Sequence, residues 1–177
     1  MKRDPLRINL RALTESDILK TCAWHNDKNI KDYYAGHPFP VNIEMEKRWY
    51  DKILTENFPS TVFGIEVLPA KELIGLVTLK DINLINRNCE LSIYIGEMAN
   101  RGKGYATEAT REALSFAFLK LGLHRVWLRV MDGNENAVKM YERLGFKKEG
   151  THSQSLYRDG SFRDEHIYAL LREEWHD

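Results

Sequence analysis

The strongest chemical signal in this chain is a loop with two glycines and two cations. Its residues are Arg101, Gly102, Lys103, Gly104, Tyr105 and Ala106. A short β-branched and aromatic segment precedes it, and a long amphipathic run follows, which is typical of a strand and then a helix N-terminus. Glycines let such a loop turn its N–H groups toward a ligand, and free N–H groups at a helix start attract anions. The loop is therefore predicted to cradle a pyrophosphate.

Two common phosphate-binding loops do not fit these residues. A Walker loop needs Ser or Thr directly after its lysine, and Gly104 follows Lys103 instead. The dinucleotide fingerprint needs a third glycine where Thr107 stands. An ordinary glycine-containing loop between a strand and a helix is the remaining alternative.

A second segment, residues 134–146, strengthens the interpretation of this loop as a binding site. It reads Asn-Glu-Asn-Ala-Val-Lys-Met-Tyr-Glu-Arg-Leu-Gly-Phe. It resembles the GNAT superfamily signature Asn-x-x-Ala-x-x-x-Tyr-x-x-x-Gly-Phe. The pattern Arg101-x-x-Gly104-x-Ala106 resembles the acetyl-CoA motif of the same N-acetyltransferases, and the order of the two motifs also fits.

This resemblance implies an α/β fold in one domain, residues 1–177. A central twisted mixed sheet, mainly antiparallel, would splay in the middle and be flanked by about four helices. Acetyl-CoA would enter the split. The backbone of Tyr94, Ile95 and Gly96 would hold its acetyl and pantetheine arm, and residues 101–106 its pyrophosphate.

The second motif supplies further candidates by the same resemblance. Asn134 and Asn136 would face the cofactor, and Tyr141 would be the general acid toward the departing thiolate. The asparagines also suit turn and cap positions, and a tyrosine on a helix face is often a core aromatic. Both interpretations stay open from sequence.

Direct acetyl transfer needs a proton acceptor as well as an acid. An ammonium with a pKa of about 10 must lose a proton before it attacks, and the oxyanion that forms needs an N–H donor. Glu90 begins the strand before the loop and is a candidate base. It could equally be a solvated acid or an ion-pair partner of Arg87. Acylation of Cys22 or Cys89 would need a base that we do not identify.

Composition excludes several classes of function. The 177 residues carry 26 basic and 26 acidic side chains, so no net charge favours nucleic acid or a membrane. There is no run of 18 apolar residues and no secretory h-region, and two isolated cysteines suit a reduced, cytoplasmic protein. The six histidines lack metal-ligand spacing, so no metal is expected.

Hydrophobic periodicity predicts the elements that position these residues. Helices are expected over residues 14–24, 43–54, 106–121 and 134–144. Strands are expected over residues 6–13, 62–68, 73–79, 89–95, 125–131, from 146 onward, and 166–171. Tight turns are expected at residues 69–72 and 158–161.

The acceptor is the least specified part. The chain is similar to bacterial spermidine N-acetyltransferases and to ribosomal-protein N-terminal acetyltransferases, but residues 34–40 lack the acidic cluster that a polycation needs. Residues 24–27, Trp-His-Asn-Asp, look like those of acetyltransferases acting on amino sugars or aminoglycosides. Acceptors thus include a polyamine, an amino sugar or a peptide N-terminus, with Tyr33 and Tyr34 predicted to line the pocket. A catalytically silent CoA-binding or regulatory module is the alternative function.

An apolar group near the end of the chain predicts a possible homodimer contact. Trp175 with Tyr168 and Leu170 forms an apolar group near the end of the chain that could meet a second copy. Packing of the same residues onto their own sheet is the other possibility.

Overall fold

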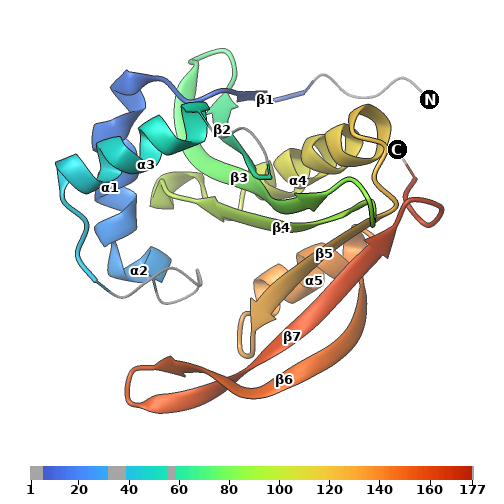
Figure 1. Cartoon of the computed structure of the whole chain (residues 1–177). Helices are drawn as coiled ribbons and strands as arrows, with labels where there is room; N and C mark the ends of the chain where they lie inside the picture. The colour runs from blue at the N-terminus through green and yellow to red at the C-terminus, as the bar shows by residue number, and fades with distance from the viewer. Residues whose placement is uncertain (1–5, 32–38, 56–58, 177) are drawn as a thin grey trace.

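Seven strands form one mixed sheet in the order β1-β2-β3-β4-β5-β7-β6 (Figure 1). The structure is a computed structural model and describes residues 6–31, 39–55 and 59–176. The strands are β1 (Ile8–Arg11), β2 (Thr61–Val67), β3 (Glu72–Asn83), β4 (Asn88–Ile95), β5 (Arg125–Met131), β6 (Lys147–Arg158) and β7 (Ser161–Leu171). The α-helices in the described ranges are α1 (Ile18–Asn26), α2 (Lys28–Lys31), α3 (Ile43–Thr55), α4 (Tyr105–Ser115) and α5 (Glu135–Arg143).

The sheet splays between β4 and β5. These strands run parallel and pair only over Asn88–Arg125, Cys89–Val126 and Glu90–Trp127. Beyond Glu90 each strand continues alone, β4 to Ile95 and β5 to Met131. The other strand pairs are antiparallel. The predicted split in a mainly antiparallel sheet is confirmed.

A seam of small residues seats α4 on the sheet. Ala109, Ala113 and Ala117 are fully buried, and the helix continues past Ser115 through a π-helical turn, Phe116–Lys120. Small side chains let helix and sheet approach closely, as the sequence predicts. Leu91 and Ile95 of β4 belong to this core.

The alternate residues of β4 face the other way. Because successive side chains of a strand point to opposite faces, Glu90, Ser92 and Tyr94 share the face opposite Leu91 and Ile95. Figure 1 shows α1, α2 and α3 grouped beside β2–β4, away from α4 and α5. Trp24 of α1 lies in a separate hydrophobic cluster, with Tyr94 packed against it.

Three predicted strand boundaries are wrong. β1 is shorter than residues 6–13 because Thr14 and Asp17 form a capping box that starts a 3-10 turn. β3 continues to Asn83, four residues past the predicted end. β7 begins at Ser161 rather than 166, because its first residues pair with the end of β6. The side chains of β6 are mostly exposed, so the sequence shows no alternation of apolar and polar residues that would reveal this pairing.

The apolar group near the C-terminus is part of the monomer core. Trp175 is 7% exposed, Tyr168 3% and Leu170 0%. The Trp175 ring lies 5.5 Å from that of Phe118, centroid to centroid. These side chains are therefore not available to contact a second copy.

Candidate active site

A cavity of about 580 Å³ occupies the split between β4 and β5. Both predicted catalytic side chains line it, Glu90 from β4 and Tyr141 from α5. Strand divergence creates this space because backbone pairing stops at Glu90. Other residues lining it are Ser92, Tyr94, Ile95, Arg101, Arg129, Asn134, Asn136, Arg158 and Glu165.

The predicted anion cradle lines an adjoining cavity of about 480 Å³. Gly104 is the N-cap of α4 and has a φ of 87°, a left-handed conformation that favours glycine. The helix starts at the next residue, so its first N–H groups lie beside this cavity. Arg101, Gly102, Gly104, Tyr105 and Ala106 line the cavity.

Two residues predicted to hold the cofactor lie differently from the rest. Lys103 lines neither this adjoining cavity nor the one in the split, and its Nζ lies 3.4 Å from Asn100 Oδ1. Gly96 donates its N–H to the carbonyl of Ile74 at 2.8 Å. A Cβ on Gly96 would meet the Trp24 ring at 2.2 Å, so this glycine allows α1 to approach β4.

Tyr141 connects the two cavities. It lines both, is 6% exposed and lies edge-on to Phe146, with ring centroids 5.6 Å apart. Among the described residues its hydroxyl has no hydrogen-bond partner. Burial raises the pKa of this phenol above its ordinary value, so it carries its proton at neutral pH. Tyr141 is therefore a core aromatic by packing that also borders both cavities with a protonated hydroxyl.

The two asparagines of the second motif lie at the N-terminus of α5. Asn134 caps this helix, and its Oδ1 accepts a hydrogen bond from the Ala137 N–H at 3.3 Å. Asn134 lines the cavity in the split, and Asn136 lines both cavities. Helix capping alone thus explains why residue 134 is an asparagine. Asn136 makes no such cap, and its position beside both cavities would allow it to contact a ligand.

Glu90 is held by a cation. Arg129 Nε and Nη2 lie 3.2 Å and 3.3 Å from its two oxygens, and Glu90 is 6% exposed. Arg129 Nη1 lies 3.5 Å from Glu165, which is 3% exposed. Burial lowers the pKa of Arg129, but the two carboxylates outweigh this and raise it overall. Glu90 is thus an ion-pair partner, as one alternative predicted, but the cation is Arg129 and not Arg87. Arg87 instead donates to the Gly122 carbonyl.

Sequence reasoning missed Arg129, Glu165 and a further cavity under the N-terminal helices. The signal for Arg129 is a charged residue between the buried Leu128 and Val130. The further cavity, also about 580 Å³, is lined by α1–α3 and β2–β4 and shares Ile30, Lys80 and Tyr94 with the cavity in the split. Tyr33 and Tyr34 lie outside the described residues.

A left-handed glycine at a helix start, beside a cavity that shares Tyr141 with the cavity in a split sheet, is the arrangement expected of a CoA-dependent acyltransferase. Residues 7–147 match the family model described as the acetyltransferase (GNAT) domain. The chain belongs to this GNAT acetyltransferase family and uses acetyl-CoA.

Known relatives extend over nearly the whole chain. The spermidine N(1)-acetyltransferase of Vibrio cholerae is 34% identical over 165 residues, which is 93% of each chain. A crystal structure of the V. cholerae spermidine N-acetyltransferase in complex with CoA and spermine superposes with a TM-score of 0.88 at 31% identity, covering 95% of this chain and 97% of that one. The putative ribosomal N-acetyltransferase YdaF of Bacillus subtilis is 36% identical over 63% of this chain and 62% of its own length.

Two other features of the described residues bear on function. None of their helices is both long and apolar enough to span a membrane. They also contain no group of three or more His, Cys, Asp or Glu side chains placed to bind a metal ion.

Proposed function

We propose that this N-acetyltransferase transfers the acetyl group of acetyl-CoA directly to a primary amine in the split between β4 and β5. One observation carries the proposal: Tyr141 lines both the cradle cavity and the cavity in the split. Acetyl-CoA held at residues 101–106 would thus reach the acceptor past a buried acid. The family supports the reaction type, and the two cavities support its position.

The chemistry assigns roles to the residues lining the split. The neutral amine attacks the thioester carbonyl, and the C–N bond forms as the C–S bond breaks. Tyr141 would give its proton to the departing thiolate. Glu90, Ser92 and Tyr94 line this cavity from one face of β4, where the amine would sit. Since Arg129 occupies both oxygens of Glu90, this carboxylate is also a structural partner.

Three acceptor classes remain candidates for this chain. The named relatives support a polyamine. The lining of the split is mixed in charge, with Lys80, Arg129 and Arg158 beside Glu90 and Glu165. Mixed charge suits an amino sugar or a peptide N-terminus better than a polycation, which would be repelled by the cations.

The decisive experiment is release of free CoA thiol from acetyl-CoA with four acceptors: spermidine, glucosamine, kanamycin and a peptide with a free N-terminus. We expect turnover with one class, with mass spectrometry showing one added acetyl group. Tight acetyl-CoA binding without turnover on any amine would support a silent CoA-binding module instead.

Location and assembly are part of the same proposal. A cytoplasmic location is supported by Cys22 and Cys89, which are both buried and unpaired. A homodimer needs a surface other than the buried C-terminal group. The exposed aromatic pair Tyr157 and Phe162, where β6 meets β7, is the candidate contact.

A further inference from the structure

A buried carboxylate that the acetyl-transfer scheme does not use lies under the N-terminal helices. Glu46 of α3 is 1% exposed, and its Oε1 has no hydrogen-bond partner among the described residues. It lines the cavity between α1, α3 and β2–β4. Burying an ionisable group costs free energy unless the group is paired, and such groups are often found at functional sites.

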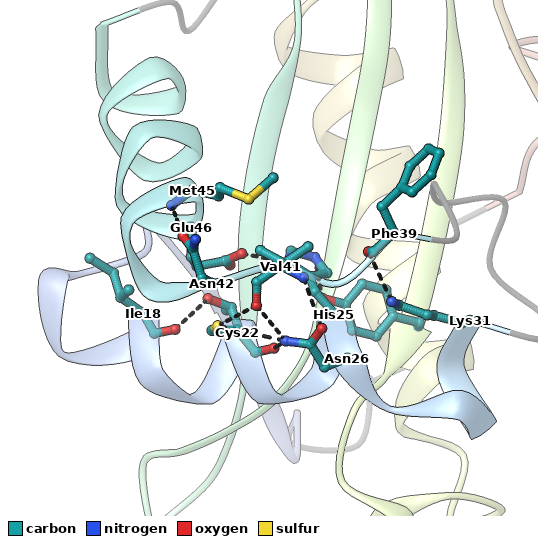
Figure 2. Close-up of polar contacts among 12 residues, drawn as sticks. Ile18, Cys22, His25, Asn26, Lys31, Phe39, Val41, Asn42, Met45 and Glu46 are labelled. Carbon is teal, nitrogen blue, oxygen red and sulfur yellow. Dashed lines mark hydrogen bonds and ion pairs between the residues drawn. The ribbon is translucent and has the colours of Figure 1, made fainter.

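The partner of Glu46 is a histidine on the neighbouring helix. His25 Nδ1 lies 2.8 Å from Glu46 Oε2, and His25 Nε2 lies 3.4 Å from the Tyr94 hydroxyl. Figure 2 shows His25 and Glu46 facing each other across the α1–α3 contact. Three side chains from α1, α3 and β4 thus form one line of polar atoms.

Aromatic packing fixes the two rings of this line. Trp49 meets the His25 ring edge-on at 5.3 Å, and Trp24 meets the Tyr94 ring edge-on at 6.0 Å. Rings held in this way keep the polar atoms aligned. The line of polar atoms runs from one cavity to the other. Tyr94 lines the split, where the amine would sit, and His25 lines the second cavity.

The partners determine which nitrogen of His25 carries the proton. A carboxylate only accepts hydrogen bonds, so His25 Nδ1 donates to Glu46. In the neutral ring Nε2 is then an acceptor, and the Tyr94 hydroxyl donates to it. This is the arrangement in which a carboxylate orients a histidine as a base.

We propose that Tyr94 and His25 form a proton relay that deprotonates the acceptor ammonium, with Glu46 as the residue that positions His25. This proposal rests on the proposed acetyl transfer. The ammonium proton passes to the Tyr94 oxygen as the Tyr94 proton moves to His25 Nε2, which leaves a neutral amine to attack the thioester. The imidazolium, stabilised by Glu46, then releases the proton to water, because the His25 side chain is 22% exposed.

Other charged groups surround the relay. The second cavity is also lined by Lys31 of α2, Lys52 of α3, and Lys80 and Asp81 of β3. Cys22 of α1 lies near Glu46, and burial together with this carboxylate raises the pKa of its thiol, so it remains neutral.

The first test needs no acceptor. Histidine side-chain ¹⁵N NMR of the wild-type protein at neutral pH, assigned by the signal lost in His25→Gln, reports which nitrogen is protonated. We expect His25 in the Nδ1–H form, with Glu46→Gln shifting it toward Nε2–H. An Nε2–H form in the wild type would overturn the relay, whatever the activity of the enzyme.

The second test is the pH profile of kcat/KM with the fastest of the four acceptors named above. Tyr94→Phe and His25→Gln should each lose about a hundred-fold or more at pH 7, and much less at pH 10, where the amine is already neutral. Their affinity for acetyl-CoA, measured by calorimetry, should stay at the wild-type value. The control is His152→Gln, which changes an exposed histidine on β6.

Glu90→Gln is the competing arm of this test. If the pH-dependent loss follows Glu90→Gln and is absent from His25→Gln, Glu90 is the base and the relay is wrong. A wild-type enzyme without turnover on any acceptor would refute the proposed function separately, since the NMR result stands by itself.

Discussion

At the scale of single residues, this site uses side chains that packing has already fixed. Tyr141 lies in the main hydrophobic cluster against Phe146, yet it borders both cavities. Glu90 and Glu165 are buried but share Arg129. Burial holds each of these side chains in one rotamer, and fixed geometry is what a proton-transfer site requires.

Tyr141→Phe tests the acid. We expect kcat to fall by at least about ten-fold, because loss of a general acid costs about a hundred- to ten-thousand-fold. Because the pKa of Tyr141 is raised, the phenol keeps its proton beyond pH 10, so the loss should be constant between about pH 7 and 9.5. Thiol release in steady state measures it.

The matched control is Tyr168→Phe. This buried hydroxyl donates to Glu142 at 3.2 Å, away from the cavities, so its removal should lower stability and leave kcat unchanged. If Tyr141→Phe behaves like Tyr168→Phe, losing stability but not turnover, Tyr141 is a packing residue and the thiolate takes its proton elsewhere.

At the scale of elements, the junctions between strands and helices position the candidate site. The loop before α4 places Gly104 in a left-handed conformation, so that the helix begins at the cavity. The turn before α1 joins that helix to the sheet, because Asp17 accepts from Arg11 of β1 and from Thr14. Arg11 in turn donates to Glu66 of β2.

Gly104→Val tests the cradle. A β-branched residue is strained at this positive φ, and its Cβ would meet Arg7 Nη2 at 3.1 Å. We expect acetyl-CoA affinity to fall at least about ten-fold by calorimetry, as side-chain bulk displaces the anion from the N–H groups. Gly160→Val, at a similar φ of 80° in the β6–β7 turn, controls for strain alone. Equal affinity in the two variants would refute the cradle.

Asp17→Asn tests the β1–α1 junction. Burial raises the pKa of this carboxyl, but hydrogen bonds from Arg11 and Thr14 outweigh it and lower the pKa overall. A lowered pKa stabilises the fold above the unfolded-state value of about 4 and ceases to do so as pH falls through the folded-state value.

Asp17→Asn should therefore reduce the free energy of unfolding by about 1–3 kcal/mol at pH 7, and the difference from wild type should shrink below about pH 3. Urea denaturation at both pH values measures this, with the exposed Asp51→Asn on α3 as control. A difference that persists unchanged in acid would mean that the charge of Asp17 is not what stabilises the junction.

At the scale of the whole molecule, two parts of the sheet are joined by a short seam. One part is β1–β4 and the other β5–β7, and only three residue pairs connect β4 with β5. The candidate active-site cavity lies where that seam ends, and residues from both parts line it. A cofactor bound in the split would contact both parts.

Self-association is predicted to use the outer end of β6–β7. Tyr157 and Phe162 are 60% and 63% exposed, with ring centroids 5.1 Å apart. Light scattering at micromolar concentration should give the mass of two chains, and the double variant Tyr157→Ser, Phe162→Ser that of one, because exposed apolar area drives such contacts. The wild type at the mass of a single chain would contradict the prediction.

The sequence by itself determined what is encoded locally. The loop at residues 101–106, the strand Arg125–Met131 and the cap at Asn134 follow from neighbouring residues, because turns, periodicity and capping depend on contacts a few positions apart. The family resemblance rests on the same contiguous stretches. The first part of β7, residues 161–165, escaped because only one of its five side chains is buried, which leaves little hydrophobic pattern.

Only the tertiary structure decided which side chains meet. His25, Glu46 and Tyr94 come from α1, α3 and β4, and His25 lies 21 and 69 positions from its two partners. Arg129 reaches Glu90 across 39 positions at the edge of the split. No local rule specifies such contacts, since they depend on how the sheet diverges and how helices pack over it.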